Sequence, residues 1–271
     1  MKNNLFDFIA DSKTINNFNI TNHVEKLNKS YQKTHRFLDN HFSREIKENL
    51  NKFHQRWFEM QLIEKLLAAN INLVQCNEGQ PDIQIKLLSG NTLWIECTAP
   101  TPGEYKDKIA LHIEPNKKPG EQIEMQETPI NYMLPRITSA VKAKIEQYEK
   151  CKQATLFNQN DIHVLVMNIA LFSPFLRQPF IGIFSGFKNV YFDWHAETII
   201  TPPCKSITKP TCNNLIEIGY LNNPDFPFNA VILSSEKLGS ISSTPGYYKP
   251  LLKPSFDPTH EIITIFERIC A

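Results

Sequence analysis

The chain has almost no net charge and no long hydrophobic run. Its 29 Lys and Arg residues and 28 Asp and Glu residues leave a formal net charge of +1, so any surface for a polyanion must be a local patch. The longest apolar run, HVLVMNIALF, is too short to span a bilayer. The N-terminal stretch MKNNLFDFIADSK lacks the apolar segment of a signal peptide. We therefore expect a soluble, cytoplasmic protein, with secretion by a non-classical route left open.

Patterns that mark several common protein classes are also absent. No HExxH, GxSxG or P-loop pattern occurs, so nothing points to a zinc protease, a nucleophile-elbow hydrolase or a P-loop nucleotide-binding protein. The six cysteines include no CxxC pair, and a disulfide framework is not expected in a chain of this length. Cys204 and Cys212 flank a loop, but no second ligand pair makes that loop a zinc site. We expect reduced, mostly buried thiols.

What the chain does contain is enough apolar material for a sizeable core. Of the 271 residues, 41% are hydrophobic and 11% aromatic, which excludes a disordered chain. No internal repeat divides the sequence. The patterns predict a polar, helical N-terminal extension over 1–42, a core over 43–175 and an elaboration of the same domain over 176–271.

Helix and strand signals follow one another in an order typical of an α/β domain. Stretches without Gly or Pro predict helices over 43–69 and 137–151, and a Pro-punctuated connector covers 99–135. Runs typical of strands are INLVQ, DIQIKLL, TLWIEC, DIHVLVMNIALF, FIGIF, NVYF, NLIEIGYL and FNAVILSS. The order helix, three strands, helix, strand predicts an α/β fold with a mixed sheet.

The stretch QPDIQIKLLSGNTLWIECTAP, residues 80–100, is typical of a β-hairpin with its turn at LSGN. Because side chains alternate between the two faces of a strand, one face is apolar. That face holds Ile83, Ile85, Leu87, Leu93, Ile95 and Cys97. Folding about the turn brings Asp82 opposite Glu96, within one residue. Opposed like charges destabilise a strand pair, so either both acids are solvated or a positive group lies between them.

Each of the two predicted helices places one charged residue within an apolar stripe. At about 100° per residue, Glu59 lies at the centre of an arc of apolar side chains, whereas Glu64 lies on the outer side. Lys144 lies in a similar arc with Ile137 and Val141. A buried charge is costly unless it is paired or bound to a metal. The alternatives for Glu59 are a side chain that reaches solvent at the edge of the helix or an internal salt bridge, and the alternative for Lys144 is a side chain that reaches solvent.

Taken in order, these residues resemble the PD-(D/E)XK nuclease superfamily, the fold of restriction endonucleases and Holliday-junction resolvases. The resemblance rests on RWFEMQLIEKLLAANINLVQ, QPDIQI and LWIECTAP, and it covers roughly residues 40–175. More narrowly, RWFEM, PDIQI, LWIECTAPTPG and LPRITSAVKAKIEQY resemble an uncharacterised bacterial branch of that superfamily. The resemblance implies a restriction-endonuclease-like core of a helix, a three-strand meander, a helix and a strand.

Carried over residue by residue, the resemblance makes Asp82 and Glu96 metal-binding acids and Glu59 the helix acid that supports or completes the metal site. The triplet Glu96-Cys97-Thr98 departs from the pattern, because threonine stands where the family has lysine. An ammonium can polarise a water or steady a phosphoryl oxygen, and threonine supplies no charge. Lys144 is the natural substitute, so the expected catalytic residues are Glu59, Asp82, Glu96 and Lys144. Gln147 and Thr98 are the expected substrate-binding residues.

The implied activity is metal-dependent hydrolysis of phosphodiester bonds. Carboxylate oxygens suit Mg²⁺ or Mn²⁺, either of which activates a bound water and stabilises charge on the phosphate. The implied partner is nucleic acid, DNA before RNA, and the homodimers common among such nucleases are one assembly to expect. The alternative is an inactive relative that binds nucleic acid or a protein partner, which the departure at Thr98 favours.

Overall fold

The structure is a computed structural model that describes most of the core of the chain. The described residues are 5–11, 23–101, 103, 130–154, 156–172, 177–188, 191–193, 198–200, 203–204, 206–208, 215–236, 249–257 and 261–270. They form an α/β fold around a six-stranded mixed sheet, which confirms the predicted class. The strands of this sheet are β1 (Leu73–Val74), β2 (Ile83–Lys86), β3 (Thr92–Thr98), β4 (Ile162–Asn168), β11 (Ala230–Ser234) and β12 (Leu251–Leu252), side by side in that order.

The sheet combines an antiparallel meander with a parallel centre. Strands β1, β2 and β3 pair antiparallel, β3, β4 and β11 pair parallel, and β12 closes the far edge antiparallel. Gly90 closes the hairpin turn between β2 and β3 with a φ of 86°, a left-handed conformation that glycine adopts without strain. Its amide donates to the carbonyl of Leu87 at 3.0 Å. The pairing of Ile83 with Ile95 places the predicted apolar set of the hairpin on one face, as expected.

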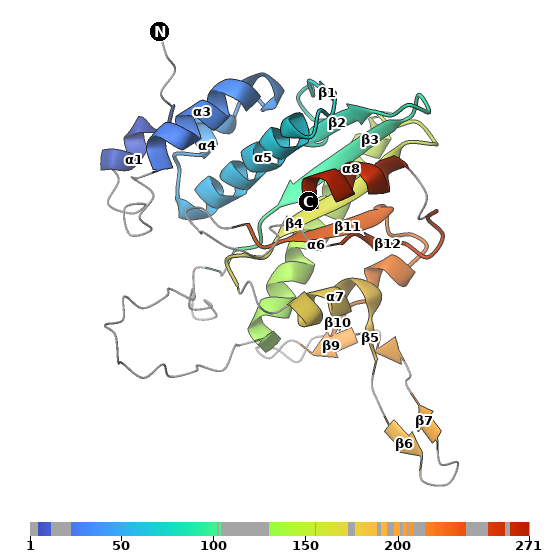
Figure 1. Ribbon diagram of the computed structural model, residues 1–271. Coiled ribbons are helices and arrows are strands. Elements are labelled where there is room, and N and C mark those ends of the chain that lie inside the picture. The colour runs from blue at the N-terminus through green and yellow to red at the C-terminus, as the bar shows by residue number, and fades with distance from the viewer. Residues whose placement is uncertain are drawn as a thin grey trace, which may run out of the picture.

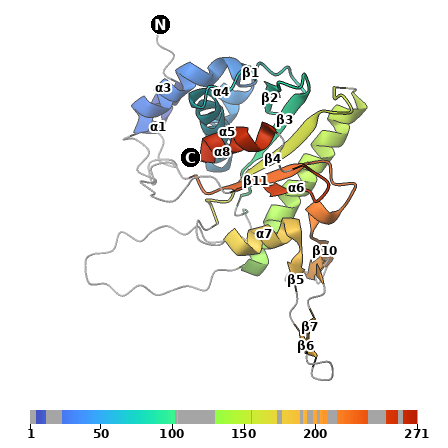
Figure 2. The same ribbon diagram turned by 45° about the vertical axis from the view of Figure 1, so that its right-hand side comes forward.

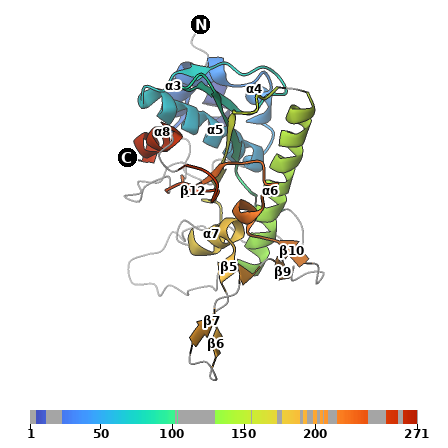
Figure 3. The same cartoon turned by 90° about the vertical axis from the view of Figure 1, so that its right-hand side faces the viewer.

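Helices cover both faces of the sheet, so the fold has three layers (Figures 1 and 2). Helices α5 (Leu50–Ala68) and α8 (Glu261–Cys270) pack on one face. Helices α6 (Ile130–Gln153) and α7 (Arg177–Ser185) pack on the other, as the view along the sheet shows (Figure 3). Because β3 and β4 are covered on both sides, every residue of these two strands is buried. The face of the hairpin that carries Glu96 is therefore not open to water.

The described part of the N-terminal segment packs against α5. It comprises η1 (Leu5–Asp7), α1 (Phe8–Asp11), α3 (Val24–Thr34), η3 (His35–Phe37) and α4 (Phe42–Glu45). Phe6 is fully buried, and its ring meets the ring of Phe53 edge-on at 6.4 Å. Phe6 and Leu27 belong to the same hydrophobic cluster as α5 and the sheet. The described residues before 43 are thus part of the main core.

Two sequence predictions of secondary structure are wrong. The single helix over 43–69 is broken, because α4 ends at Glu45 and α5 begins at Leu50. Asn49 caps the second helix, since its side-chain oxygen accepts a hydrogen bond from the amide of Lys52 at 2.9 Å. The run FIGIF is helical and lies in α7 rather than in a strand. Its short apolar pattern fits a buried helix as well as a buried strand.

Helix α6 is longer than the predicted 137–151 and begins inside the predicted connector. It runs through Pro135, whose missing N–H falls in the second turn of the helix. Residues 104–129 of the connector lie outside the described residues, and so do the lysines at 106, 108, 117 and 118 and the segment WHAE at 194–197.

The chain between α7 and β11 contributes short pieces outside the main sheet. They are β5 (Phe187–Lys188), β6 (Tyr191–Asp193), β7 (Thr198–Ile200), β8 (Pro203–Cys204), β9 (Ser206–Thr208), β10 (Leu215–Glu217) and η4 (Tyr220–Asn222). The predicted strand NVYF corresponds in part to β6, which pairs with β7. Cys76, Cys97 and Cys151 are free thiols, as expected. In the part of the chain that the structure describes, no helix is both long and apolar enough to cross a membrane.

Candidate active site

Asp82 and Glu96 lie at the open end of the β2–β3 hairpin. The register pairs Ile83 with Ile95, and one further step along both strands places Asp82 opposite Glu96. The position predicted from the turn is therefore confirmed. Asp82 precedes β2, and its Oδ2 accepts a hydrogen bond from the amide of Cys97 at 2.7 Å. That bond fixes the Asp82 carboxylate against β3.

Lys144 supplies the positive charge between these two acids. It projects from α6, on the same side as the fully buried Ile137 and Val141, and is itself 8% exposed. Its Nζ donates to Glu96 Oε2 at 2.6 Å and to Asp82 Oδ2 at 3.2 Å. A third hydrogen bond, 3.2 Å long, goes to Oε1 of Gln147, one turn further along α6. Lys144 thus forms a buried salt bridge that both acids share.

Burial dominates the electrostatics of Glu96 and Lys144. Burial raises the pKa of Glu96 to about 8; the charge of Lys144 opposes this shift, and the charge of Asp82 adds to it. Burial lowers the pKa of Lys144, but Asp82 and Glu96 outweigh burial, so its net pKa is raised and the ammonium stays charged. Glu96 is 3% exposed, and its Oε1 has no hydrogen-bond partner in the part of the chain that the structure describes. Such an atom costs free energy unless a ligand or water satisfies it.

Glu59 lies buried on α5, where an arginine holds it. Its Oε2 accepts a hydrogen bond from Nη1 of Arg56 at 2.7 Å. The pKa of Glu59 is raised to about 8; burial is the largest cause, the nearby charge of Asp82 also raises it, and Arg56 acts in the opposite direction. The predicted interior position of Glu59 is confirmed. The contact found there is a salt bridge with Arg56, which was the alternative considered from the sequence.

The described residues provide two carboxylates for a metal ion rather than three. No three Asp, Glu, His or Cys side chains within the described ranges are grouped as metal ligands. The pair Asp82 and Glu96 remains, with Glu96 Oε1 as a buried oxygen that has no hydrogen-bond partner among the described residues. Carboxylate oxygens are suitable ligands for Mg²⁺ or Mn²⁺, and Mg²⁺ commonly binds to one or two carboxylates plus waters and phosphate. The donor set therefore fits such an ion.

The structure brings together most of the residues that the sequence predicted. Asp82, Glu96, Lys144 and Gln147 are joined by hydrogen bonds. Thr98 is buried at the end of β3, two residues beyond Glu96 and so on the same face of the sheet.

Sequence reasoning missed two groups, the Arg56 guanidinium and the Cys97 amide. Arg56 stands three residues before Glu59, a spacing that puts both on one face of a helix and signals an ion pair. The amide leaves no sequence signal, because backbone contacts depend on register.

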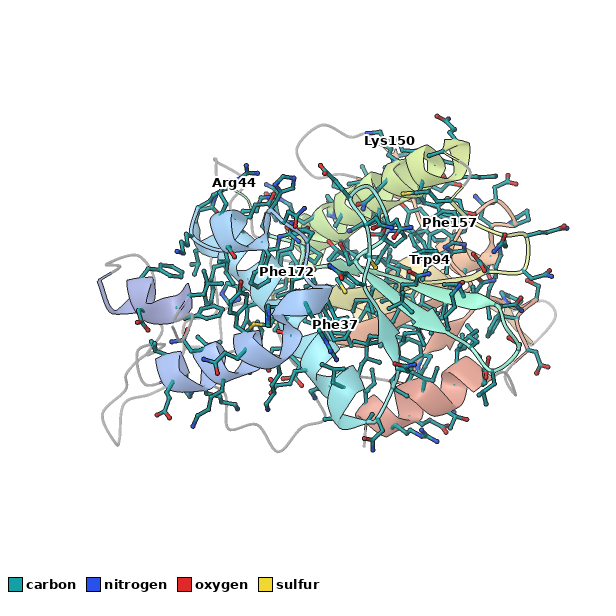
Figure 4. The ribbon with its side chains drawn as sticks, turned by 90° about the horizontal axis from the view of Figure 1, so that it is seen from above. Phe37, Arg44, Trp94, Lys150, Phe157 and Phe172 are labelled. Atoms are coloured by element: carbon teal, nitrogen blue, oxygen red, sulfur yellow. The ribbon has the colours of Figure 1, made fainter. Side chains whose placement is uncertain are left out.

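Other polar residues of the core serve structure. Asp161 accepts hydrogen bonds from the Trp94 indole at 2.9 Å and from the Thr92 amide at 3.0 Å, and Trp94 packs beside Phe157 (Figure 4). Burial lowers the pKa of His163 to about 4, so this histidine is neutral near pH 7. The side chain of Asn168 donates to the carbonyl of Glu236 at 2.9 Å and accepts from the Ala170 amide at 3.0 Å.

Comparison with protein-family models, with curated proteins and with solved structures finds no match to this chain. The assignment of a function therefore depends on the geometry of the site and on the resemblance of its motifs.

Proposed function

We propose that this chain is a metal-dependent nuclease that hydrolyses phosphodiester bonds of nucleic acid, with a restriction-endonuclease-like core. The supporting observation is the contact of Asp82, Glu96 and Lys144 at the end of the hairpin, where one oxygen of Glu96 is buried without a hydrogen-bond partner among the described residues. The element order α5, β1, β2, β3, α6, β4 agrees with the core that the motif resemblance implies. The same resemblance makes DNA the first substrate to test.

Each residue has a distinct role in this proposal. Asp82 and Glu96 would hold the metal ion, and the amide of Cys97 orients the Asp82 carboxylate. When bound, a Mg²⁺ or Mn²⁺ ion would lower the pKa of a water and stabilise charge on the phosphate. Lys144 carries the ammonium that the triplet Glu96-Cys97-Thr98 lacks, and Gln147 orients it through their 3.2 Å hydrogen bond.

Glu59 would act on the metal site through its charge once it is ionised, which its pKa of about 8 places above neutral pH in the metal-free protein. Its carboxylate lies close enough to Asp82 for the two charges to raise its pKa, and it is bound to Arg56. Thr98 lies on the face of Glu96 and could donate a hydrogen bond to a phosphate oxygen, without supplying charge. Both roles are proposals that rest on position.

The second candidate is a nuclease-fold protein that binds nucleic acid or a protein partner without cleaving it. One observation favours it: Lys144 already contacts both acids, so the site holds a counter-charge without a metal ion. In that case the ion pair would be structural. Removing a partner from a buried pair is strongly destabilising, whatever the function.

The deciding experiment is a cleavage assay on plasmid DNA, single-stranded DNA and RNA, with Mg²⁺, Mn²⁺ or EDTA. We expect metal-dependent cleavage by the wild type, reduced roughly 100-fold or more in Glu96→Gln. Lys144→Met, which preserves side-chain length, should lose activity to a similar extent, roughly 100-fold. Lys142→Ala is the matched control, because Lys142 is an exposed lysine on the same helix.

Thermal unfolding in the presence of Mn²⁺ separates the two candidates where cleavage alone does not. A metal ion that binds only the folded state raises the melting temperature, and Glu96→Gln should abolish that rise. A wild type that neither cleaves nor gains stability with Mn²⁺, yet binds DNA in EDTA, would establish the binding module instead.

A further inference from the structure

Arg56 contacts three carboxylates with one guanidinium. Nη1 donates to Glu59 at 2.7 Å, Nε donates to Glu45 at 2.8 Å, and Nη2 donates to Asp39 at 2.8 Å. Nη2 also lies 2.6 Å from the same oxygen of Glu45. Arg56 is buried, and charge-assisted hydrogen bonds of this length in a buried setting are strong and directional.

The three partners come from different parts of the chain. Asp39 lies in the loop before α4, Glu45 ends α4, and Glu59 lies in the middle of α5. Glu59 in turn interacts electrostatically with Asp82. Hydrogen bonds therefore lead from segment 39–45 through Arg56 to Glu59, and α5 packs against β3, where the Cys97 amide holds the Asp82 carboxylate.

We propose that Arg56 is a positioning residue, through which segment 39–45 controls how the Glu59 carboxylate is presented to the metal site. This inference rests on the proposed metal-dependent function. Glu45 and Asp39 occupy Nε and Nη2, so only Nη1 is left for Glu59. Arg56 thereby holds Glu59 through one of its oxygens, Oε2.

The planar guanidinium explains why Glu45 matters to a site that it does not touch. Arginine pairs with a carboxylate most strongly through two parallel hydrogen bonds. If Glu45 no longer holds Nε, the guanidinium can turn toward Glu59 and bind both of its oxygens. Glu59 would then be withdrawn from the metal site.

A second ionic contact between the N-terminal segment and α5 provides a matched control. Glu64 on α5 binds Lys33 of α3 at 2.9 Å and accepts a hydrogen bond from Ser30 at 2.5 Å. Its side chain is 22% exposed, against 18% for Glu45, so the two carboxylates have similar burial. Glu64 joins the same two parts of the chain but has no contact with Arg56 or with Glu59 among the described residues.

The test is Mn²⁺ affinity, measured by titration calorimetry at one pH in Glu45→Gln, Glu64→Gln, Arg56→Gln and the Glu45→Gln/Arg56→Gln double variant. We expect Glu45→Gln to weaken Mn²⁺ binding about tenfold, as for other residues that orient a metal ligand. Glu64→Gln should bind as the wild type does. In the Arg56→Gln background, Glu45→Gln should have no further effect, because the path between Glu45 and Glu59 is gone.

The inference is overturned if Glu45→Gln binds Mn²⁺ as tightly as the wild type. It is also overturned if Glu45→Gln weakens Mn²⁺ binding equally in the wild-type and Arg56→Gln backgrounds, because an equal loss would indicate a through-space effect of charge alone. A wild type that binds no Mn²⁺ defeats the proposed function and this inference with it, whereas binding without dependence on Glu45 defeats only the inference. If Arg56→Gln does not fold, Arg56→Lys takes its place in the same four measurements, because a single ammonium cannot hold three carboxylates in the arrangement of a guanidinium.

Discussion

At the scale of single residues, Glu96 and Glu59 are carboxyls that folding makes harder to ionise. Their pKa values are raised from an ordinary value near 4.5 to about 8, with burial as the main cause. A carboxyl with a raised pKa in the folded state binds more protons when folded than when unfolded. Its contribution to stability is therefore full below about pH 4.5 and is lost as the pH rises through about 8.

This gives a prediction for the metal-free protein. Between pH 5.5 and 8.5, the free energy of unfolding of the wild type should fall relative to that of Glu96→Gln, which cannot ionise. Glu64→Gln is the control, because the pKa of Glu64 is lowered by folding and Glu64 stays ionised throughout this range. Urea unfolding at several pH values measures the difference, and parallel curves for wild type and Glu96→Gln would contradict it.

At the scale of elements, helix α5 carries Arg56 and Glu59, and its start is set by one cap. Asn49→Ala should destabilise the protein by about 1 kcal/mol, because the amide of Lys52 loses its acceptor. Asn49→Asp retains an acceptor and should stay close to the wild type. For a domain of this size the alanine variant should melt roughly 2–4 °C lower. Equal melting temperatures for the two variants would show that the cap does not matter.

At the scale of the whole molecule, the N-terminal segment is part of the main hydrophobic core. Phe6→Ala should cost about 3–5 kcal/mol, because it leaves a cavity against Phe53 and Tyr31. Leu88→Ala is the control: that side chain is 99% exposed and should change stability by no more than about 0.5 kcal/mol. Chemical denaturation measures both. A small effect of Phe6→Ala would mean that the N-terminal segment is dispensable for the fold.

The sequence by itself determined the fold class, the hairpin and the inward placement of Glu59 and Lys144. These follow from local periodicity, since alternation in strands and the 3.6-residue repeat in helices decide which side chains share a face. The same reasoning failed for FIGIF, because a short buried run has no clear period, and for 43–69, because the cap at Asn49 interrupts an otherwise helical pattern.

Only the tertiary structure decided which charges meet. Lys144 pairs with Asp82 and Glu96 only because α6 crosses the end of the hairpin. Lys144 itself lies more than 45 residues from Glu96 in the sequence. Arg56 joined Asp39, Glu45 and Glu59 because α4 folds back on α5. A sequence pattern predicts the charge of each residue and the face on which it lies. Which charged side chains form ion pairs depends on the distances and the burial that packing creates.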